Sequence, residues 1–128
     1  SVLKKDEILR NVLVPGFTPS ERTVSGFIKI GNRNSMEIAL ASFAYHITAD
    51  KDGVISSAGA AIGSVAETIR YVASASEFLL EKNLDKLTED DSNKFADLVL
   101  EYANPITDIR ASAWYRRKVL WNISKSIF

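Results

Sequence analysis

The sequence predicts an α+β fold, in which an antiparallel sheet of three to four strands is followed by three helices packed on one face of the sheet. Segments rich in β-forming residues occupy the first half of the chain, and apolar residues with helical spacing occupy the second half. A length of 128 residues with 46% hydrophobic content suits one domain with its own core. We therefore expect residues 1–128 to form a single domain.

Four segments are expected to be strands, at residues 7–14, 24–30, 37–48 and 54–62. The first contains the β-formers Ile8, Val12 and Val14, and Pro15 then opens a polar loop that lasts to Thr23.

Turns separate the later strands. Residues 31–35 have a turn composition, because Gly and Asn accept positive φ angles at low cost. Residues 50–53 are expected to join 37–48 and 54–62 as an antiparallel hairpin. A helical interpretation of 37–47 stays open, because Ala and Leu are good helix formers.

The first helix is expected to start at Ser64, since Ser64 and Glu67 have the spacing of a capping box, and to end near Asn83. The residues that share its apolar face are Val72, Ala75, Ser76, Leu79 and Leu80.

The second helix is expected to start at Thr88, where three acidic residues suit the positive end of the helix dipole, and to end at Asn104 and Pro105. Its apolar stripe consists of Phe95, Leu98, Val99 and Tyr102. Asp108 is expected to cap a third helix over residues 109–127. The inward residues of this third helix are predicted to be Ile109, Ala113, Leu120, Ile123 and Ile127.

Composition excludes several classes of function. The 16 basic and 16 acidic residues cancel, so no charge excess favours nucleic acid or an anionic membrane surface. Cysteine is absent, which excludes a disulfide, a cysteine nucleophile and thiolate ligation of a metal by this chain. No apolar run approaches the roughly 18 residues that span a bilayer. Charged residues at 4–7 stand where a signal peptide needs an apolar core, so a cytoplasmic location is expected.

Single conspicuous residues do not indicate catalysis, and we expect neither a catalytic residue nor a metal site. His46 is the only histidine and is expected to be structural or on the surface. The acids at 89–91 fit a helix start better than an acid–base pair. Trp114 and Trp121 share a helix face, which favours core packing or a subunit interface over ligand stacking.

A first cationic cluster is the most promising candidate site. Lys29 lies at the end of a predicted strand and Arg33 lies in the next turn, so that both side chains could face an anionic ligand. The alternative is a solvated turn without function.

A second cluster covers residues 108–117, where three arginines lie around a helix start beside aromatic residues. The alternative here is ion pairing on the helix surface, either between Asp108 and Arg110 or between Arg116 and an acid elsewhere.

Three motifs that include these clusters resemble the patterns of one known family. Residues 29–39 match Lys-x-x-x-Arg-x-x-x-Asp-Ile-Ala without a gap, with Glu37 in place of the aspartate. Residues 62–80 resemble the series Gly-Gly-Val-Ala, Arg and Glu-x-x-Leu, with Ser64 in place of the second glycine.

The third motif, residues 105–117, is similar to the closing pattern Asp-x-Arg-x-Ser-x-x-Tyr-Arg. Together the motifs resemble the C-terminal domain of the FAD-binding (medium) subunit of molybdenum hydroxylases. This family includes the flavoproteins of xanthine dehydrogenase, carbon monoxide dehydrogenase and aldehyde oxidoreductase. The resemblance runs from about Glu7 to the end of the chain.

The resemblance implies an accessory role, with no catalysis by this chain alone. In that family a larger FAD-binding domain precedes this one and holds the pyrophosphate in glycine-rich loops, which are absent here. The chain would then be an excised C-terminal domain, in keeping with its start at Ser1. Electrons in such enzymes pass from a molybdenum cofactor through 2Fe-2S clusters, both in partner subunits, to FAD and then to an acceptor such as NAD. This domain would close over the flavin ring and dock on the FAD-binding domain and the partner subunits.

The resemblance also implies cofactor-binding roles for Lys29 and Arg33. Lys29 would point toward the flavin ring, where its positive charge stabilises the anionic reduced form and raises the potential. Arg33 would brace the loop, supported by Glu37. FAD would be held mainly by the absent domain, so this chain alone is not expected to retain it. An exposed docking face would favour self-association of the isolated chain.

Two alternatives stay open at this point. The chain could be a free-standing protein-interaction module without bound flavin, or a small ligand-binding α+β domain for which Lys29 and Arg33 are the only convergent polar set. Neither nucleic acid nor a membrane is expected as a partner.

Overall fold

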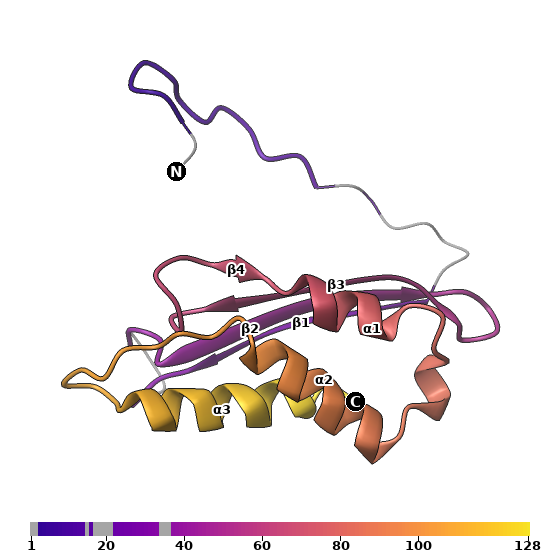
Figure 1. The fold of residues 1–128 in the computed structure, drawn as a ribbon. Coiled ribbons are helices and arrows are strands. Elements are labelled where there is room, and N and C mark those ends of the chain that lie inside the picture. The colour runs from indigo at the N-terminus through magenta and orange to yellow at the C-terminus, as the bar shows by residue number, and fades with distance from the viewer. Residues whose placement is uncertain (1–2, 15, 17–21, 34–36) are drawn as a thin grey trace.

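The four strands come first and the three α-helices follow, which confirms the predicted α+β fold (Figure 1). The computed structural model describes residues 3–14, 16, 22–33 and 37–128. The elements are β1 (Arg22–Ile30), β2 (Ala41–Ala49), β3 (Ile55–Gly63), β4 (Arg70–Tyr71), α1 (Ala73–Leu79), the 3-10 turn η1 (Leu84–Lys86), α2 (Glu89–Leu100) and α3 (Ala113–Lys125).

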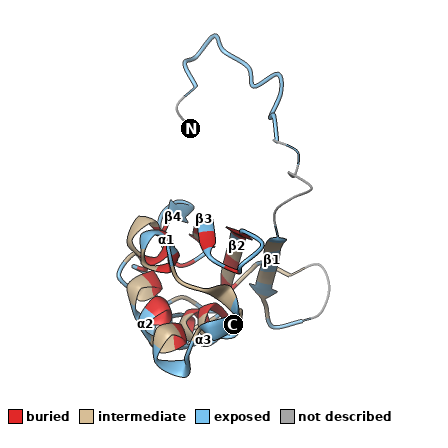
Figure 2. Cartoon of the chain, turned by 90° about the vertical axis from the view of Figure 1, so that its right-hand side faces the viewer, coloured by how far each residue is buried: buried red, intermediate tan, exposed pale blue. Residues whose placement is uncertain are grey.

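The strands form one antiparallel sheet in the order β1-β2-β3-β4. All three helices lie on the same side of this sheet, so that its other face carries no helix (Figures 1 and 2). No helix among the described residues combines the length and the apolar character that crossing a bilayer needs.

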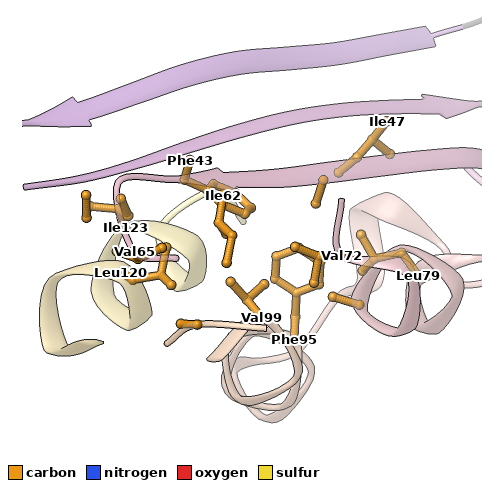
Figure 3. Packing of buried hydrophobic residues seen from close by; sticks show 14 of the residues in the cluster. Phe43, Ile47, Ile62, Val65, Val72, Leu79, Phe95, Val99, Leu120 and Ile123 are labelled. Carbon is orange, nitrogen blue, oxygen red and sulfur yellow. The ribbon is translucent and has the colours of Figure 1, made fainter. Parts of the chain in front are cut away.

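The core lies between the sheet and the helices. Phe43 of β2 and Phe95 of α2 meet edge to face, with 6.1 Å between their ring centroids (Figure 3). Ile62 of β3, Val99 of α2 and Leu120 of α3 pack against the same cluster and are buried. Each layer thus contributes an apolar stripe that it cannot bury alone.

The hairpin of β2 and β3 is confirmed, and the helical interpretation of residues 37–47 is wrong. Alternate residues of β2, among them Phe43 and Ile47, are buried against the helices, so the period of two outweighs the helix propensity of Ala and Leu. In the connecting turn Gly53 has a φ of +80°, and the Asp50 carboxylate accepts the N–H of Val54. β2 begins only at Ala41, because the residues before it belong to the connection from β1.

The predicted strand at 7–14 is wrong. These residues have no regular structure and lie apart from the sheet (Figure 1), with Ile8 89% and Leu13 88% exposed. The β-forming residues pair with no strand among the described residues. The interactions of an unpaired strand do not offset the conformational entropy that its backbone loses on ordering. The predicted loop at 15–23 and turn at 31–35 fall partly outside the described residues.

The predicted start of the first helix is also wrong. Ser64 has a φ of +63°, and residues 64–69 form a loop that leads into β4. α1 begins at Ala73, where the Ser76 hydroxyl accepts the N–H of Ala60 and fastens the helix to β3. The predicted apolar face is correct apart from Leu80, which lies beyond the helix and is 40% exposed.

The second helix is confirmed at its start, because Thr88 and Asp91 cap α2 reciprocally.

The predicted cap of the last helix is wrong, since the hydroxyl of Ser112, rather than Asp108, accepts an N–H at the start of α3. Ile109 therefore lies outside the helix and is 98% exposed instead of buried. Leu120 and Ile123 are buried as predicted, and Ile127 packs against the core.

Candidate functional site

Lys29 lies near the end of β1 on the face of the sheet that carries no helix. Its neighbours Ile28 and Ile30 pack against the core, and alternate residues of a strand point to opposite faces. Phe27 therefore shares the open face with Lys29, and its side chain is 67% exposed. This arrangement places a cation and an aromatic ring together on an uncovered surface.

Glu37, a described residue between β1 and β2, contacts Lys29. The Lys29 ammonium donates to the main-chain oxygen of Glu37 at 2.9 Å. The N–H of Leu40 donates to the oxygen of Ile30 at 2.7 Å, which closes the connection at its base. Residues 34–36 lie outside the described residues.

Arg33 and Glu37 form an ion pair across the same connection, with Nε and Oε2 2.7 Å apart. The Glu37 side chain is only 11% exposed, whereas that of Arg33 is 73% exposed. A Cβ on Gly31 would come within 2.6 Å of Glu37 Cγ, so glycine is needed for this carboxylate to lie across the loop. Lys29, Arg33 and Glu37 are therefore brought together as one unit.

A shallow apolar hollow of about 100 Å³ lies on the open face beside Phe27. Its floor is made of small residues of β2 and β3, including Ala44, Ala61 and Gly63, and Ile69 lies at its rim. A Cβ on Gly63 would lie 2.7 Å from the Ser42 hydroxyl, so a larger residue there would require the Ser42 side chain to move.

The second cluster is a buried clamp, which corrects the interpretation of Arg116 as part of surface ion pairing. Arg116 is 5% exposed, and its Nη2 donates to both carboxylate oxygens of Asp108, at 2.9 and 3.0 Å. It also donates to the main-chain oxygens of Leu40, at 2.7 Å, and Ser64, at 3.2 Å. The weaker contact from Arg110 to Asp108, at 3.4 Å, is the surface pair that the sequence predicts.

Asp108 is held ionised in this clamp. The N–H groups of Ala111 and Arg110, followed by the Arg116 guanidinium, lower the pKa of Asp108 from 3.8 to about 2. The two clusters meet at Leu40. Its N–H donates to the oxygen of Ile30 at the base of the connection from β1 to β2, which we call the Lys29 loop, and its oxygen accepts a hydrogen bond from Arg116. Sequence reasoning missed Leu40 and Ser64, because both act through their main chain and carry no chemical signal in the side chain.

The remaining conspicuous residues lie elsewhere. His46 is exposed on β2, 3.4 Å from the hydroxyl of Thr48. Trp114 is 71% exposed on α3, so that core packing does not explain it. Among the described residues, no three metal-ligating side chains gather in one place.

Comparison with known proteins assigns this chain to a protein family. The family model of the CO dehydrogenase flavoprotein C-terminal domain matches residues 27–128, which include the Lys29 loop and the Arg116 clamp. A search of curated proteins finds no match.

Solved structures share the fold. CO dehydrogenase from Hydrogenophaga pseudoflava, in a form lacking the Mo-pyranopterin moiety of the molybdenum cofactor, is 24% identical over 88% of this chain, with a TM-score of 0.76. Quinoline 2-oxidoreductase from Pseudomonas putida 86 is 24% identical over 85% of the chain, with a TM-score of 0.71. The chain spans only 37% and 36% of the lengths of these two proteins. A reconstituted CO dehydrogenase from Oligotropha carboxidovorans is 22% identical, with a TM-score of 0.71 over 80% of this chain and 34% of that one.

Proposed function

Because this chain belongs to the CO dehydrogenase flavoprotein C-terminal domain family, we propose that it is an accessory domain of a flavoprotein subunit. That subunit passes electrons from molybdenum and 2Fe-2S centres in partner subunits through FAD to an acceptor such as NAD. The observation that carries the proposal is the match over residues 27–128, which contains Lys29, Arg33 and Glu37 in one contiguous arrangement. This chain performs no reaction alone.

The residues on the open face fit the ring of a flavin but not its pyrophosphate. Lys29 uses one of its three N–H donors on Glu37, and Phe27 adds an exposed aromatic surface beside it. A flavin ring has the same mixture of an apolar body and acceptor atoms at its edge. The described residues form no glycine-rich phosphate cradle, since Gly53, the only glycine among them with positive φ, lies in the β2–β3 turn. FAD would therefore be held mainly by a separate FAD-binding domain of the same subunit.

FAD supplies the carrier of electrons in such a subunit, and Lys29 adjusts its potential. The positive charge of Lys29 favours the reduced, anionic form of a nearby flavin ring over the neutral oxidised form. The hydrogen bond to the Glu37 oxygen fixes the ammonium without cancelling its charge, because a carbonyl is neutral.

Arg33 and Glu37 have a positioning role in this proposal. Glu37 receives Lys29 through its main chain and Arg33 through its carboxylate, so the Arg33–Glu37 pair fixes the carbonyl that orients Lys29. The Arg33 guanidinium faces solvent and is neutralised by its partner, which leaves Lys29 as the charge that acts on the ring.

Docking would use apolar surfaces that the described structure leaves uncovered. The arm at residues 3–14 exposes Ile8, Leu9, Val12, Leu13 and Val14, and the hollow beside Phe27 faces outward. These surfaces suit the FAD-binding domain of the same subunit, and the subunits that carry molybdenum and iron–sulfur centres would complete the assembly. In the isolated chain the same surfaces favour self-association.

The test is Lys29→Ala in the intact subunit, with Lys51→Ala in the exposed β2–β3 turn as the matched control. Loss of about 1–3 kcal/mol of interaction with the reduced form lowers the potential of a two-electron couple by about 20–65 mV. We expect a shift of that size for Lys29→Ala and none for Lys51→Ala, measured by spectroelectrochemical titration. An unshifted potential and an unchanged rate of flavin reoxidation in Lys29→Ala would end the proposal.

A protein-interaction module without bound flavin is the second candidate, favoured by the exposed Trp114 and by the apolar arm. Flavin analysis of the native, full-length protein separates the two candidates. A stoichiometric flavin supports the accessory domain, and its absence supports the interaction module.

A further inference from the structure

The two tryptophans of the protein, Trp114 and Trp121, lie on the outer side of the helical layer and have no part in the Lys29 site. Trp114 is 71% exposed, which is unusual for so large an apolar side chain. Buried aromatic and arginine residues provide most of the energy of protein interfaces, so exposed ones mark surfaces that become buried on binding.

These side chains line a groove between α2 and α3 with a volume of about 310 Å³. The groove is lined by Asp97, Leu100, Trp114, Arg117, Lys118 and Trp121. An apolar side chain of a partner fits such a volume, since two indole rings and a leucine supply apolar contact.

The aromatic floor of the groove is already ordered. The Trp121 indole N–H donates to the Asp97 carboxylate at 2.9 Å, which fixes the orientation of the ring. The ammonium groups of Lys118 and Lys125 lie 5.4 and 5.3 Å from the ring centroid. A floor that is rigid before binding lowers the entropy cost of association.

The groove has two cations, Arg117 and Lys118, that form no ion pair among the described residues. Lys118 has no carboxylate within ion-pair distance among the described residues, and Arg117 donates only to the main-chain oxygens of Leu100 and Ala103. Asp97 keeps its negative charge, because the indole N–H of Trp121 that it accepts is neutral, so Arg117, Lys118 and Asp97 together give the lining a net charge of about +1. A carboxylate that entered the groove would therefore find two cations without acidic partners.

We propose that the α2–α3 groove is a docking site for a partner protein that presents an apolar side chain flanked by carboxylates. The apolar side chain covers Trp114 and Trp121, and the carboxylates meet Arg117 and Lys118. The net charge of the whole chain is zero, so this attraction is local to the groove. The site lies on the helical layer, opposite the open sheet face, and does not depend on flavin.

The experiment is selection of short random peptides displayed on phage against the protein, followed by tryptophan fluorescence with the enriched peptide in synthetic form. Because Trp114 and Trp121 are the only tryptophans, their emission reports on the groove directly. We expect enriched peptides with net negative charge and an apolar residue, which change the emission saturably. Their affinity falls at least about tenfold in Trp114→Ala and in Lys118→Glu, as for residues that dominate an interface.

Lys51→Glu makes the same charge change in the exposed β2–β3 turn and is expected to leave the affinity unchanged. Lys118→Glu keeps the test informative if Trp114→Ala disturbs folding, which circular dichroism detects. Enrichment of basic peptides, or equal recovery on Trp114→Ala, would overturn the proposal. A saturable response to oligothymidylate in place of the peptides would assign the groove to nucleic acid instead. Self-association that Trp114→Ala abolishes would assign it to a second copy of the chain.

Discussion

At the scale of single residues, one guanidinium holds together segments that are distant in the sequence. Arg116 joins the start of β2, the loop after β3 and the loop before α3 through Leu40, Ser64 and Asp108. Its Nη2 donates to both oxygens of the Asp108 carboxylate and its Nη1 donates to the two main-chain oxygens, whereas its buried Nε has no hydrogen-bond partner among the described residues. The clamp fixes the base of the Lys29 loop, although Arg116 itself lies on the last helix.

Acid should weaken this clamp. Hydrogen bonds hold the pKa of Asp108 and of Asp91 at about 2, below the 3.8 of an unperturbed aspartate. A lowered pKa in the folded state adds stability that is present above 3.8 and is lost as the pH falls toward about 2. We expect the free energy of unfolding in urea to fall over this interval, and to fall less steeply in Asp108→Asn than in the control Asp6→Asn.

Ser64 is strained, and relieving the strain should stabilise the protein. Its φ of +63° lies in the left-handed region, which costs a residue with a side chain about 1–2 kcal/mol. The greater freedom of glycine in the unfolded chain offsets about 0.4–1 kcal/mol of this. Ser64→Gly is therefore expected to raise the free energy of unfolding by about 0.5–1 kcal/mol.

The matched control is Ser57→Gly in β3, an exposed strand residue outside the left-handed region. That variant should lower the free energy of unfolding by about 0.5–1 kcal/mol, because glycine weakens a strand. Equal effects of the two substitutions in urea unfolding would contradict the assignment of strain to Ser64.

At the scale of elements, side-chain hydrogen bonds at the N-terminal ends mark where α2 and α3 begin. α2 begins with a reciprocal cap, in which the Thr88 hydroxyl accepts the N–H of Asp91 and the Asp91 carboxylate accepts the N–H of Thr88. α3 begins with Ser112, while Asp108 closes its own turn by accepting the N–H groups of Arg110 and Ala111. An aspartate engaged in such a turn is no longer available to a helix.

Removal of the α2 cap should be measurable. Thr88→Ala leaves the N–H of Asp91 without its side-chain acceptor and is expected to lower the free energy of unfolding by about 1 kcal/mol. Thr88→Ser retains the hydroxyl and should leave stability nearly unchanged. Urea unfolding of both variants provides the measurement, and an equal loss in the two would show that the hydroxyl does not act as a cap.

Local sequence was sufficient where the deciding interactions are local. The β2–β3 turn, the start of α2 and the burial of Phe95 and Val99 all follow from residues that lie close together in the chain. The first helix was misplaced because Ser64 and Glu67 have cap spacing, whereas Arg116, 52 residues away, fixes the backbone at Ser64. The hydrophobic periodicity of the sequence also does not predict the contacts of Lys29 or the burial of Arg116. Both depend on main-chain carbonyls that the fold brings close.

At the scale of the whole molecule, the protein has two layers and an arm that belongs to neither. Within the arm at residues 3–14, the N–H of Glu7 donates to the oxygen of Lys4 and the N–H of Lys4 donates to the Glu7 carboxylate, while the apolar side chains at 8, 9 and 12–14 are exposed. Propensity predicted a strand there, but a strand needs a neighbour to satisfy its hydrogen bonds. The stability of the two layers should therefore be independent of the arm.

Deletion of residues 1–14 tests this independence. The free energy of unfolding is expected to change by less than about 0.5 kcal/mol, as for changes away from packed features. Deletion of residues 1–14 should also reduce self-association, because it removes exposed apolar surface. Urea unfolding and analytical ultracentrifugation measure the two effects, and a large loss of stability would mean that the arm packs on the sheet.

The hydrogen bond from Arg116 to the Leu40 oxygen also determines when the base of the Lys29 loop can be completed during synthesis. Arg116, which donates to the oxygen of Leu40, is added 76 residues later, on α3. While the ribosome still holds that helix, the sheet can pair, but the base of the cationic loop lacks one of its anchors. The surface proposed to meet the cofactor is thus completed only when α3 has left the ribosome, so a chain that is truncated before Arg116 would lack this anchor of its loop.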